Sequence, residues 1–218
     1  MSLQIQSLSI HHKNESSLIK NVDLVINQGE VLTLMGPSGC GKSTLLSAIA
    51  GHLANDFWLE GSILLDGQPI QSAQPHLRQV GILFQDDLLF PHLNIWENIA
   101  IALPNEIKGQ KRKERALECL QQVKLDHLAF SMPNQVSGGQ RARISLLRML
   151  QANPKVVLLD EPFSKLDKDL RETFRAWVFD QLKQAQIPAL MVTHDEDDIP
   201  SDGKLIYWEN LKKEMLNA

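Results

Sequence analysis

A glycine-rich segment, GPSGCGK, lies between the runs VLTLM and STLLSAIAG and constrains the fold more than any other part of the chain. The first run has the composition of a buried strand, and the second has that of a helix. The pattern Gly36-x-x-x-x-Gly41-Lys42-Ser43 is that of a P-loop, in the strand–loop–helix context that a P-loop requires. The segment therefore predicts an α/β fold with a phosphate-binding loop.

The residue types of this segment fit a bound nucleotide. Glycines let backbone N–H groups approach phosphate oxygens without a Cβ in the way, and the helix N-terminus adds positive partial charge. Lys42 would reach the β- and γ-phosphates, and the Ser43 hydroxyl would bind Mg²⁺. The alternative, a glycine-rich turn with an incidental lysine, is disfavoured by the flanking strand and helix. The expected nucleotide-binding residues are Gly36, Pro37, Ser38, Gly39, Cys40, Gly41, Lys42, Ser43 and Thr44.

Composition narrows the class of protein further. A net charge of −4 gives no bulk attraction to nucleic acid, so we expect no nucleic-acid partner. Cys40 and Cys119 are too few for a disulfide framework, which favours a reducing compartment. The N-terminus lacks the apolar core of a signal peptide, and no run of 18 uncharged apolar residues could span a bilayer. These features predict a cytoplasmic protein.

Apolar patterns predict two groups of strands. Alternation over residues 3–10, the run 22–26 and a hairpin over 62–70 predict an antiparallel flank. Uniformly apolar runs predict parallel strands that are covered on both faces, and 204–208 predicts an edge strand. The expected parallel strands are residues 31–35, 80–84, 156–160 and 189–193.

The pattern changes to that of helices between residues 85 and 153. Helices are expected over residues 96–103, 109–123 and 138–151. A repeat of every four residues, formed by Leu166, Leu170, Phe174 and Val178, predicts one further helix that belongs to the core. The chain therefore reads as one domain, with a core of about residues 1–84 and 154–218 and a helical subdomain over about 85–153.

Two adjacent carboxylates stand at the end of the apolar run VVLL, Asp160 and then Glu161. Asp160 would emerge at the carboxyl end of a strand, where it could hold Mg²⁺ through water beside the phosphate loop. Glu161 could then polarise a water that attacks the γ-phosphate. The alternative is a solvated acidic pair at a strand end. The presence of a P-loop in the same chain disfavours this alternative.

The segment VSGGQRAR separates the possible classes of P-loop protein. Ser137 and Gln140 form the pattern of a helix capping box, which leaves Gly138 and Gly139 unexplained because glycine weakens the first turn of a helix. The backbone N–H groups of these two glycines, at a helix N-terminus, are better explained as a second anion-binding site. A GTPase is excluded, because SKLD (164–167) lies too close to Asp160 to be a guanine-reading motif on a later strand.

Taken together, these motifs resemble those of the ATP-binding-cassette (ABC) ATPases over the whole chain. GPSGCGKST resembles the Walker A motif, VSGGQ the signature and VVLLDEP the Walker B motif. Gln85 resembles the glutamine that senses Mg²⁺ and γ-phosphate, Asp167 the D-loop aspartate, and His194 the switch histidine. The resemblance implies a RecA-like P-loop NTPase core with an antiparallel β flank and an inserted helical subdomain. It implies ATP and Mg²⁺ as cofactors, with Mg²⁺ held by Ser43, Gln85 and Asp160 and catalysis by Glu161, His194 and Gln85.

The resemblance also implies a head-to-tail homodimer. The signature residues of one subunit, Ser137, Gly138, Gly139 and Gln140, would cap the ATP on the P-loop of the other. Asp167 would lie at the interface between the subunits, and His194 would contact the γ-phosphate.

Three positions depart from the family pattern. An aromatic ring usually stacks on adenine, but this chain has SIHHKNE there, so His12, or less favourably His11, would stack. The alternative is a pair of solvated histidines in a turn at the strand end. Val136 replaces a leucine, and Lys165 replaces a small residue, which adds a charge near the expected interface.

The function that the resemblance implies is ATP-driven transport. A single cassette without a coiled-coil insertion does not fit repair or translation members. FQDDLLFPHLNIWENIAIAL resembles the ATPases that import thiamine, sulfate, molybdate, iron or polyamines, in which this segment receives a permease helix. Exposed Leu89, Phe90 and Leu93 would suit such docking, whereas a loop that covers its own core is the alternative.

We therefore expect an importer ATPase at the cytoplasmic face of the plasma membrane, without a C-terminal regulatory domain. Its partners would be membrane permease subunits and a solute-binding protein. A short exporter or lipoprotein-release ATPase, and a non-transport ABC regulator, are the alternatives.

Overall fold

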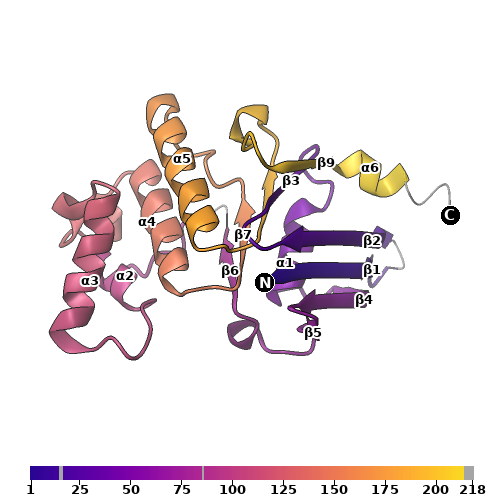
Figure 1. Ribbon diagram of the computed structural model, residues 1–218, viewed down its shortest axis with the longest axis horizontal. Helices are drawn as coiled ribbons and strands as arrows, with labels where there is room; N and C mark the ends of the chain where they lie inside the picture. Colours follow the sequence, from indigo (N-terminus) through magenta and orange to yellow (C-terminus); the bar gives the residue numbers. More distant parts are fainter. Residues whose placement is uncertain (15–16, 85, 214–218) are drawn as a thin grey trace. The chain divides into compact units, whose positions relative to one another are not determined.

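The computed structural model describes residues 1–14, 17–84 and 86–213. Figure 1 shows these residues as two β-sheets and a set of α-helices. Contacts between residues divide the chain into two compact units. Unit 1 comprises Met1–Ile82, Lys155–Glu161 and the described residues from Phe179 onward, and unit 2 comprises Leu83–Pro154 and Pro162–Val178. Residues 162–178, which the sequence assigns to the core, therefore group with the helical segment.

The first sheet is antiparallel, as predicted. Its strand order is β2 (Ser17–Asn27), β1 (Ser2–His12), β4 (Phe57–Leu65) and β5 (Gln68–Pro69). Asp66 and Gly67 join β4 to β5 with positive φ angles of 52° and 75°, which is the conformation of a tight hairpin turn. The predicted strands are present, and β2 and β4 extend beyond the predicted bounds.

A bulge in β1 explains why its apolar pattern changes phase. Leu3 and Ile5 are separated from Leu8 and Ile10 by one extra residue, and the pairing register shifts between Ile5 and Leu8. Ser7, at the bulge, has a φ of 48°. Four apolar side chains therefore point to the core, each no more than 1% exposed, although strict alternation is broken.

The second sheet contains the apolar runs of the sequence. Its order is β6 (Val80–Leu83), β7 (Val156–Asp160), β8 (Ala189–Thr193), β3 (Val31–Met35) and β9 (Lys204–Tyr207). β3 pairs in parallel with β8 and β9, and β7 pairs in parallel with β8. All residues of β3 and β8 are buried, whereas the end strands β6 and β9 are only partly covered. The predicted edge strand is confirmed.

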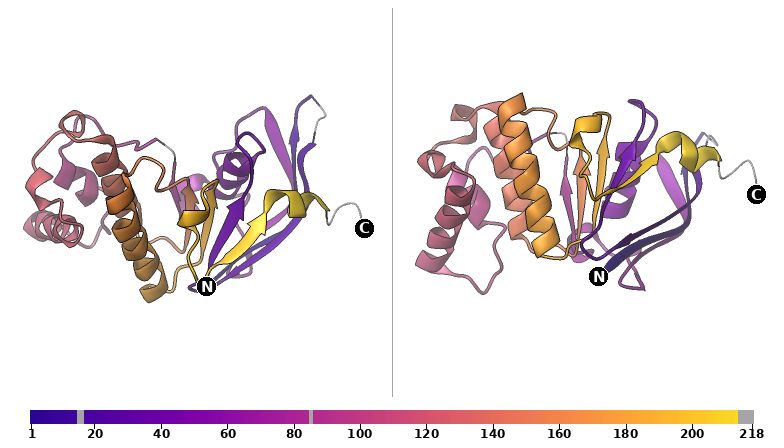
Figure 2. Two further views of the ribbon diagram at one scale, coloured as in Figure 1. Left: turned by 90° about the horizontal axis from the view of Figure 1, so that it is seen from above. Right: turned by 45° about the horizontal axis from the view of Figure 1, so that its top comes forward.

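Helix α1 (Lys42–Ala50) connects the two sheets through one hydrophobic core. Leu45, Leu46 and Ile49 are 0% exposed and pack in a cluster with apolar side chains of both sheets. Figure 2 shows α1 beside the strands of unit 1. Arg78 donates to the carbonyl oxygens of Ala48 and Ile49, both at 2.9 Å, and so satisfies the last turn of α1.

Unit 2 contains the three helices predicted between residues 85 and 153. They are α2 (Ile95–Ala100), α3 (Gly109–Gln122) and α4 (Gly138–Gln151). Helix α4 has the predicted bounds. Helix α2 ends three residues before the predicted end, because Ala102 and Leu103 continue as turns that bond to Ile99 and Ala100.

The helix predicted from the four-residue repeat is present, but Leu166 lies before its start. Helix α5 is Lys168–Gln184, and Asp167 precedes it, with Oδ1 accepting a hydrogen bond from Leu170 N at 3.1 Å as an N-cap does. Leu170 is 43% exposed and so does not face a core, whereas Phe174 and Val178 are buried. A short helix α6 (Trp208–Lys213) follows β9.

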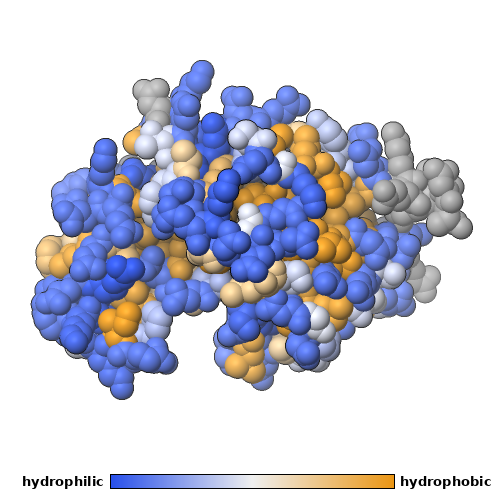
Figure 3. Space-filling model, in the orientation of Figure 1, coloured by the Kyte–Doolittle hydropathy of each residue, from blue (hydrophilic) through white to orange (hydrophobic). Residues whose placement is uncertain are grey.

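The visible face of the molecule in Figure 3 is mostly polar, with apolar residues gathered in patches. Within residues 1–14, 17–84 and 86–213, no helix is both long and apolar enough to cross a bilayer.

Candidate active site

The predicted phosphate loop follows β3 directly. Gly39 and Gly41 have φ angles of 77° and 111°, which L-residues with side chains rarely adopt. Gly41 is the last residue before α1, so the N-terminus of this helix opens onto the loop. Pro37, Ser38, Gly39 and Ser43 are exposed, and Gly36, Cys40 and Thr44 are partly exposed. The loop therefore presents its backbone to a ligand.

Lys42 lies at the centre of this loop. Its side-chain ammonium donates to the carbonyl oxygens of Gly36 at 2.7 Å and Pro37 at 2.9 Å, and it lies 3.8 Å from the sulfur of Cys40. The residue is only 6% exposed. A phosphate bound in the loop would offer this buried cation a stronger, charged acceptor than the two carbonyl oxygens.

Trp208, which the sequence analysis did not single out, packs against the phosphate loop. A Cβ on Gly36 would lie 2.6 Å from Cβ of Trp208, and a Cβ on Gly41 would lie 3.2 Å from Cζ2 of the same ring. Trp208 is 3% exposed. Packing against Trp208 therefore requires glycine at position 36, and the φ of 111° together with a close approach favours glycine at position 41. No local pattern links positions so far apart in the chain.

Ser43 and Asp160 lie together, as expected of two magnesium ligands. The Ser43 hydroxyl forms a hydrogen bond with the Asp160 carboxylate. Burial raises the pKa of Asp160, and neighbouring Glu161 raises it further, against the opposing effects of Ser43 and Lys42. Hydroxyl and carboxylate oxygens are the donors that Mg²⁺ prefers, so the pair fits this ion. Among the described residues, no cluster of three His, Cys, Asp or Glu side chains could hold a metal ion.

Glu161 and His194 are in direct contact. Glu161 Oε1 lies 2.8 Å from His194 Nδ1. The pairing of β7 with β8 brings the residues together, because Asp160 is opposite Val192 and both strands end at the same edge. Glu161 has a φ of 47°, an uncommon conformation for this residue type. The sequence predicts a role for each residue but not their contact.

The two candidate adenine-stacking histidines differ in their surroundings. The His11 ring stacks on Trp58 at 4.2 Å between centroids, and His11 Nε2 lies 3.6 Å from Glu60 Oε2. His12 meets Phe57 edge-on at 5.0 Å, and its Nδ1 accepts from Asn14 N at 3.2 Å. One face of His11 is thus already covered by Trp58. Stacking of adenine on His12 stays a prediction.

The signature segment opens α4 with a complete capping box. Ser137 Oγ accepts from Gln140 N at 3.3 Å, and Gln140 Oε1 accepts from Ser137 N at 3.0 Å. A Cβ on Gly139 would lie 3.2 Å from the carbonyl oxygen of Lys165, whereas a Cβ on Gly138 would meet only Arg141, at 3.8 Å. Gly139 is thus needed for close packing, which sequence reasoning did not foresee, and Gly138 has open space beside it.

Of the remaining predicted residues, Gln85 lies outside the described residues. Asp167 caps α5, and the proposed interface role is additional to that function. In the segment that follows Gln85, Leu89 and Leu93 are half-buried rather than exposed. The exposed apolar residues of the segment are Leu88 at 58% and Phe90 at 40%.

Asn98, on α2, holds this segment in place. It is 0% exposed, and its amide donates to the carbonyl oxygens of Phe90, Leu93 and Asn94 at 2.9–3.1 Å. Its side-chain oxygen accepts from Phe90 N at 2.8 Å. A buried asparagine within an apolar helix, NIAIAL, was the available sequence signal.

The phosphate loop, the acidic residues at the end of β7 and the capped glycine helix define a nucleotide-hydrolysing P-loop protein. The ABC transporter family model matches residues 19–164. This chain belongs to that family and is an ABC ATPase.

Individual relatives agree with this assignment. The chain is 46% identical over 192 residues to the uncharacterized ABC transporter ATP-binding protein YnjD of Escherichia coli K12, with 88% of each chain covered. It is 43% identical over 203 residues to the sulfate/thiosulfate import ATP-binding protein CysA of Neisseria meningitidis serogroup B, covering 91% of this chain but only 56% of CysA. A dimeric post-hydrolysis structure of the ATP-binding cassette MJ0796 with ADP and Pi matches with a TM-score of 0.82, at 30% identity and with 94% and 93% of the two chains covered.

Proposed function

We propose that this chain is the ATP-hydrolysing subunit of a solute importer and acts as a head-to-tail homodimer beneath a separate membrane permease. The observation that carries the transport role is the exposed apolar segment that follows Gln85, in which Leu88 and Phe90 face solvent on a loop fixed by Asn98. The importer direction is supported by the 43% identity to CysA, an import ATP-binding protein.

The P-loop would bind ATP through its backbone amides and Lys42. Ser43 and Asp160, with Gln85, would hold Mg²⁺, which neutralises charge on the phosphates when bound. Glu161 would accept a proton from the attacking water, and His194 would orient the Glu161 carboxylate and contact the γ-phosphate. His12 would lie against adenine.

The amides of Gly138 and Gly139 would complete the site in the second subunit. Gly138 supports this role because its open side leaves room for a phosphate. The dimeric state of the related MJ0796 cassette supports the dimer itself. Asp167 would then face the partner chain.

The permease would dock on the segment 86–93. A hollow of about 390 Å³ adjoins it and combines apolar and charged lining residues, namely Leu88, Leu89 and Pro133 with Asn134, Asp86, Asp87, Arg141 and Lys165. Phe90 is an exposed aromatic of the same segment, and aromatic side chains are typical anchors in protein interfaces. A solute-binding protein on the far side of the membrane would deliver the solute, and the ATPase would lie at the cytoplasmic face.

Substitution of Phe90 tests this proposal. Phe90→Asp would place a charge in the proposed contact with the permease. If that contact excludes water, the charge would weaken binding by roughly 2 kcal/mol or more. We expect the variant to lose co-purification with the permease from membranes of the source cells, and to lose solute uptake. The ATPase activity of the isolated chain should be unchanged.

Phe130→Asp is a matched control, because Phe130 is 66% exposed but lies outside the segment. Loss of folding in Phe90→Asp would identify Phe90 as a core residue. Retention of both association and uptake would place the permease contact elsewhere, and a co-purifying soluble partner without any membrane protein would favour a regulator.

A further inference from the structure

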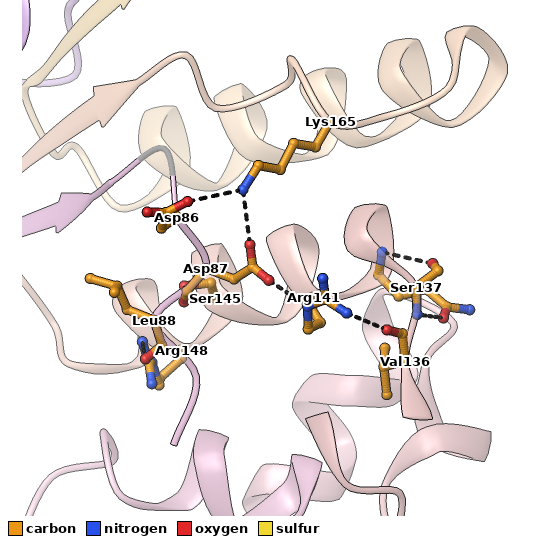
Figure 4. A network of polar contacts seen from close by, with 10 residues as sticks. Asp86, Asp87, Leu88, Val136, Ser137, Arg141, Ser145, Arg148 and Lys165 are labelled. Carbon is orange, nitrogen blue, oxygen red and sulfur yellow. Dashed lines mark hydrogen bonds and ion pairs between the residues drawn. The ribbon is translucent and has the colours of Figure 1, made fainter. Parts of the chain in front are cut away.

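Asp87 binds two cations that come from different segments of unit 2 (Figure 4). Its Oδ2 accepts from Arg141 Nε on α4 at 2.5 Å, and its Oδ1 accepts from Lys165 Nζ at 3.2 Å. The Asp87 side chain is 13% exposed, so water screens these contacts only partly. One carboxylate thus joins the segment that follows Gln85, the signature helix and the 164–167 loop.

Helix α4 holds the same segment through its backbone. The Ser145 hydroxyl donates to Asp87 O at 2.5 Å, and Arg148 donates to Leu88 O at 3.0 Å. Arg141, Ser145 and Arg148 follow one another at spacings of four and three residues, which places them on one face of the helix. Residues 86–88 would therefore stay on α4 without Lys165.

The 164–167 loop meets α4 and residues 86–87 through the backbone and the side chain of Lys165, and Asp167 interacts electrostatically with Arg143 of α4. Its backbone packs on Gly139, because a Cβ there would lie 3.2 Å from Lys165 O and 3.3 Å from Leu166 Cδ2. The side chain of Lys165 adds the ion pair with Asp87 and a contact with Asp86 at 3.6 Å. Asp86 is 87% exposed, so this second contact is weak. The pair with Asp87 is the main polar contact of the Lys165 side chain.

The charge on Asp87 is maintained by these partners. Burial alone would raise the pKa of Asp87, but hydrogen bonds from Arg141 and Lys165 outweigh it and hold the pKa below its ordinary value. The carboxylate is therefore ionised at neutral pH and can bind both cations.

We propose that Lys165 is a positioning residue for ATP hydrolysis, which fixes the 164–167 loop to residues 86–88 by sharing Asp87 with Arg141. The inference rests on the proposed roles of these segments, one toward the partner cassette and the other toward the permease. Movement of either segment would then be transmitted to the other through the shared carboxylate. Because the Lys165 side chain contacts Asp86 and Asp87, and the P-loop supplies the ATP contacts in the proposed function, we expect its loss to slow turnover without weakening ATP binding.

The test compares three substitutions in the isolated full chain. Lys165→Met keeps the length of the side chain but removes its charge, and we expect kcat to fall roughly threefold to tenfold, as for other coupled polar pairs, with KM for ATP within about twofold of wild type. Lys165→Arg can still reach Asp87 and should retain most of kcat. Lys168→Met is the matched control, since Lys168 is an exposed lysine three residues further on and should be silent.

A double-mutant cycle with Asp87→Asn adds a second criterion. If Lys165 acts through Asp87, Lys165→Met should lower kcat no further once Asp87 is neutral. The proposal is overturned if Lys165→Met has wild-type kcat, if Lys165→Arg loses as much as Lys165→Met, or if Lys165→Met does not fold. ATPase assays on the isolated chain need no permease, so this outcome is independent of the Phe90→Asp result.

Discussion

Glu161 and His194 form a pair whose geometry suits proton transfer. Glu161 Oε1 is 2.8 Å from His194 Nδ1, and the Glu161 side chain is 19% exposed while that of His194 is 57% exposed. The imidazole therefore orients a mostly buried carboxylate and remains open to a ligand on its other side. Such an arrangement positions a base and a hydrogen-bond donor within one site.

Glu161→Gln should keep this shape but remove the carboxylate that we propose as the general base. We expect ATP affinity to be unchanged and kcat to fall by roughly 10²–10⁴, the range for loss of general base catalysis. Bound ATP should then hold a dimer, visible by size-exclusion chromatography. Glu196→Gln, at an exposed carboxylate near His194, is the control and should turn over normally. Normal turnover in Glu161→Gln would exclude Glu161 as the base.

Residue positions were predictable where the chemistry is local. Asp160 and His194 could be placed at strand ends because a short apolar run precedes each of them. The packing of Trp208 on Gly36 could not be predicted, because it depends on where the chain returns after β9. The same holds for Asp87, whose partners Arg141 and Lys165 come from distant segments.

At the scale of elements, predictions succeeded where an end signal was present. The bounds of α4 match because Ser137 and Gln140 form a capping box, and β3, β7 and β8 match because their runs are uniformly apolar. The repeat for α5 included Leu166, which lies outside the helix, because periodicity does not reveal that Asp167 caps it. A four-residue repeat does not show which of its apolar residues are buried, and Leu170 is in fact exposed.

Asn98 offers a test of how an element holds the exposed segment. Asn98→Ala would remove the side-chain partners of the Phe90 N–H and of the Leu93 carbonyl oxygen, whereas the Asn94 carbonyl oxygen keeps its hydrogen bond from the backbone N–H of residue 98. Unpaired buried polar groups cost about 1–3 kcal/mol each, so we expect the free energy of unfolding to fall by about 2–3 kcal/mol after partial hydration. Urea unfolding measures this change, and exposed Asn134→Ala should stay within about 0.5 kcal/mol of wild type. An unchanged midpoint in Asn98→Ala would mean that other contacts hold the loop.

At the scale of the whole molecule, one chain carries two elements suited to phosphate. The P-loop belongs to unit 1 and the capped signature helix to unit 2. In the proposed head-to-tail dimer, each ATP contacts the P-loop of one chain and the signature of the other. A site built from two chains predicts that two different inactive variants can restore activity when they are mixed. A site within one chain predicts no such recovery.

Two inactive variants should therefore restore activity when mixed. Lys42→Ala removes the phosphate-binding cation, and Gly138→Asp places a carboxylate where the open side of Gly138 would receive a phosphate, with the nearest side-chain atom at 3.8 Å. Each variant alone lacks an intact composite site, but a heterodimer has one site without either lesion. At equal concentrations half of the dimers are mixed and half of their sites are intact, so ATPase activity should reach about a quarter of wild type if sites act independently. A steady-state ATPase assay of the mixture measures this recovery, and the double variant mixed with either single variant should restore none. A mixture as inactive as its components would show that no site combines the two chains.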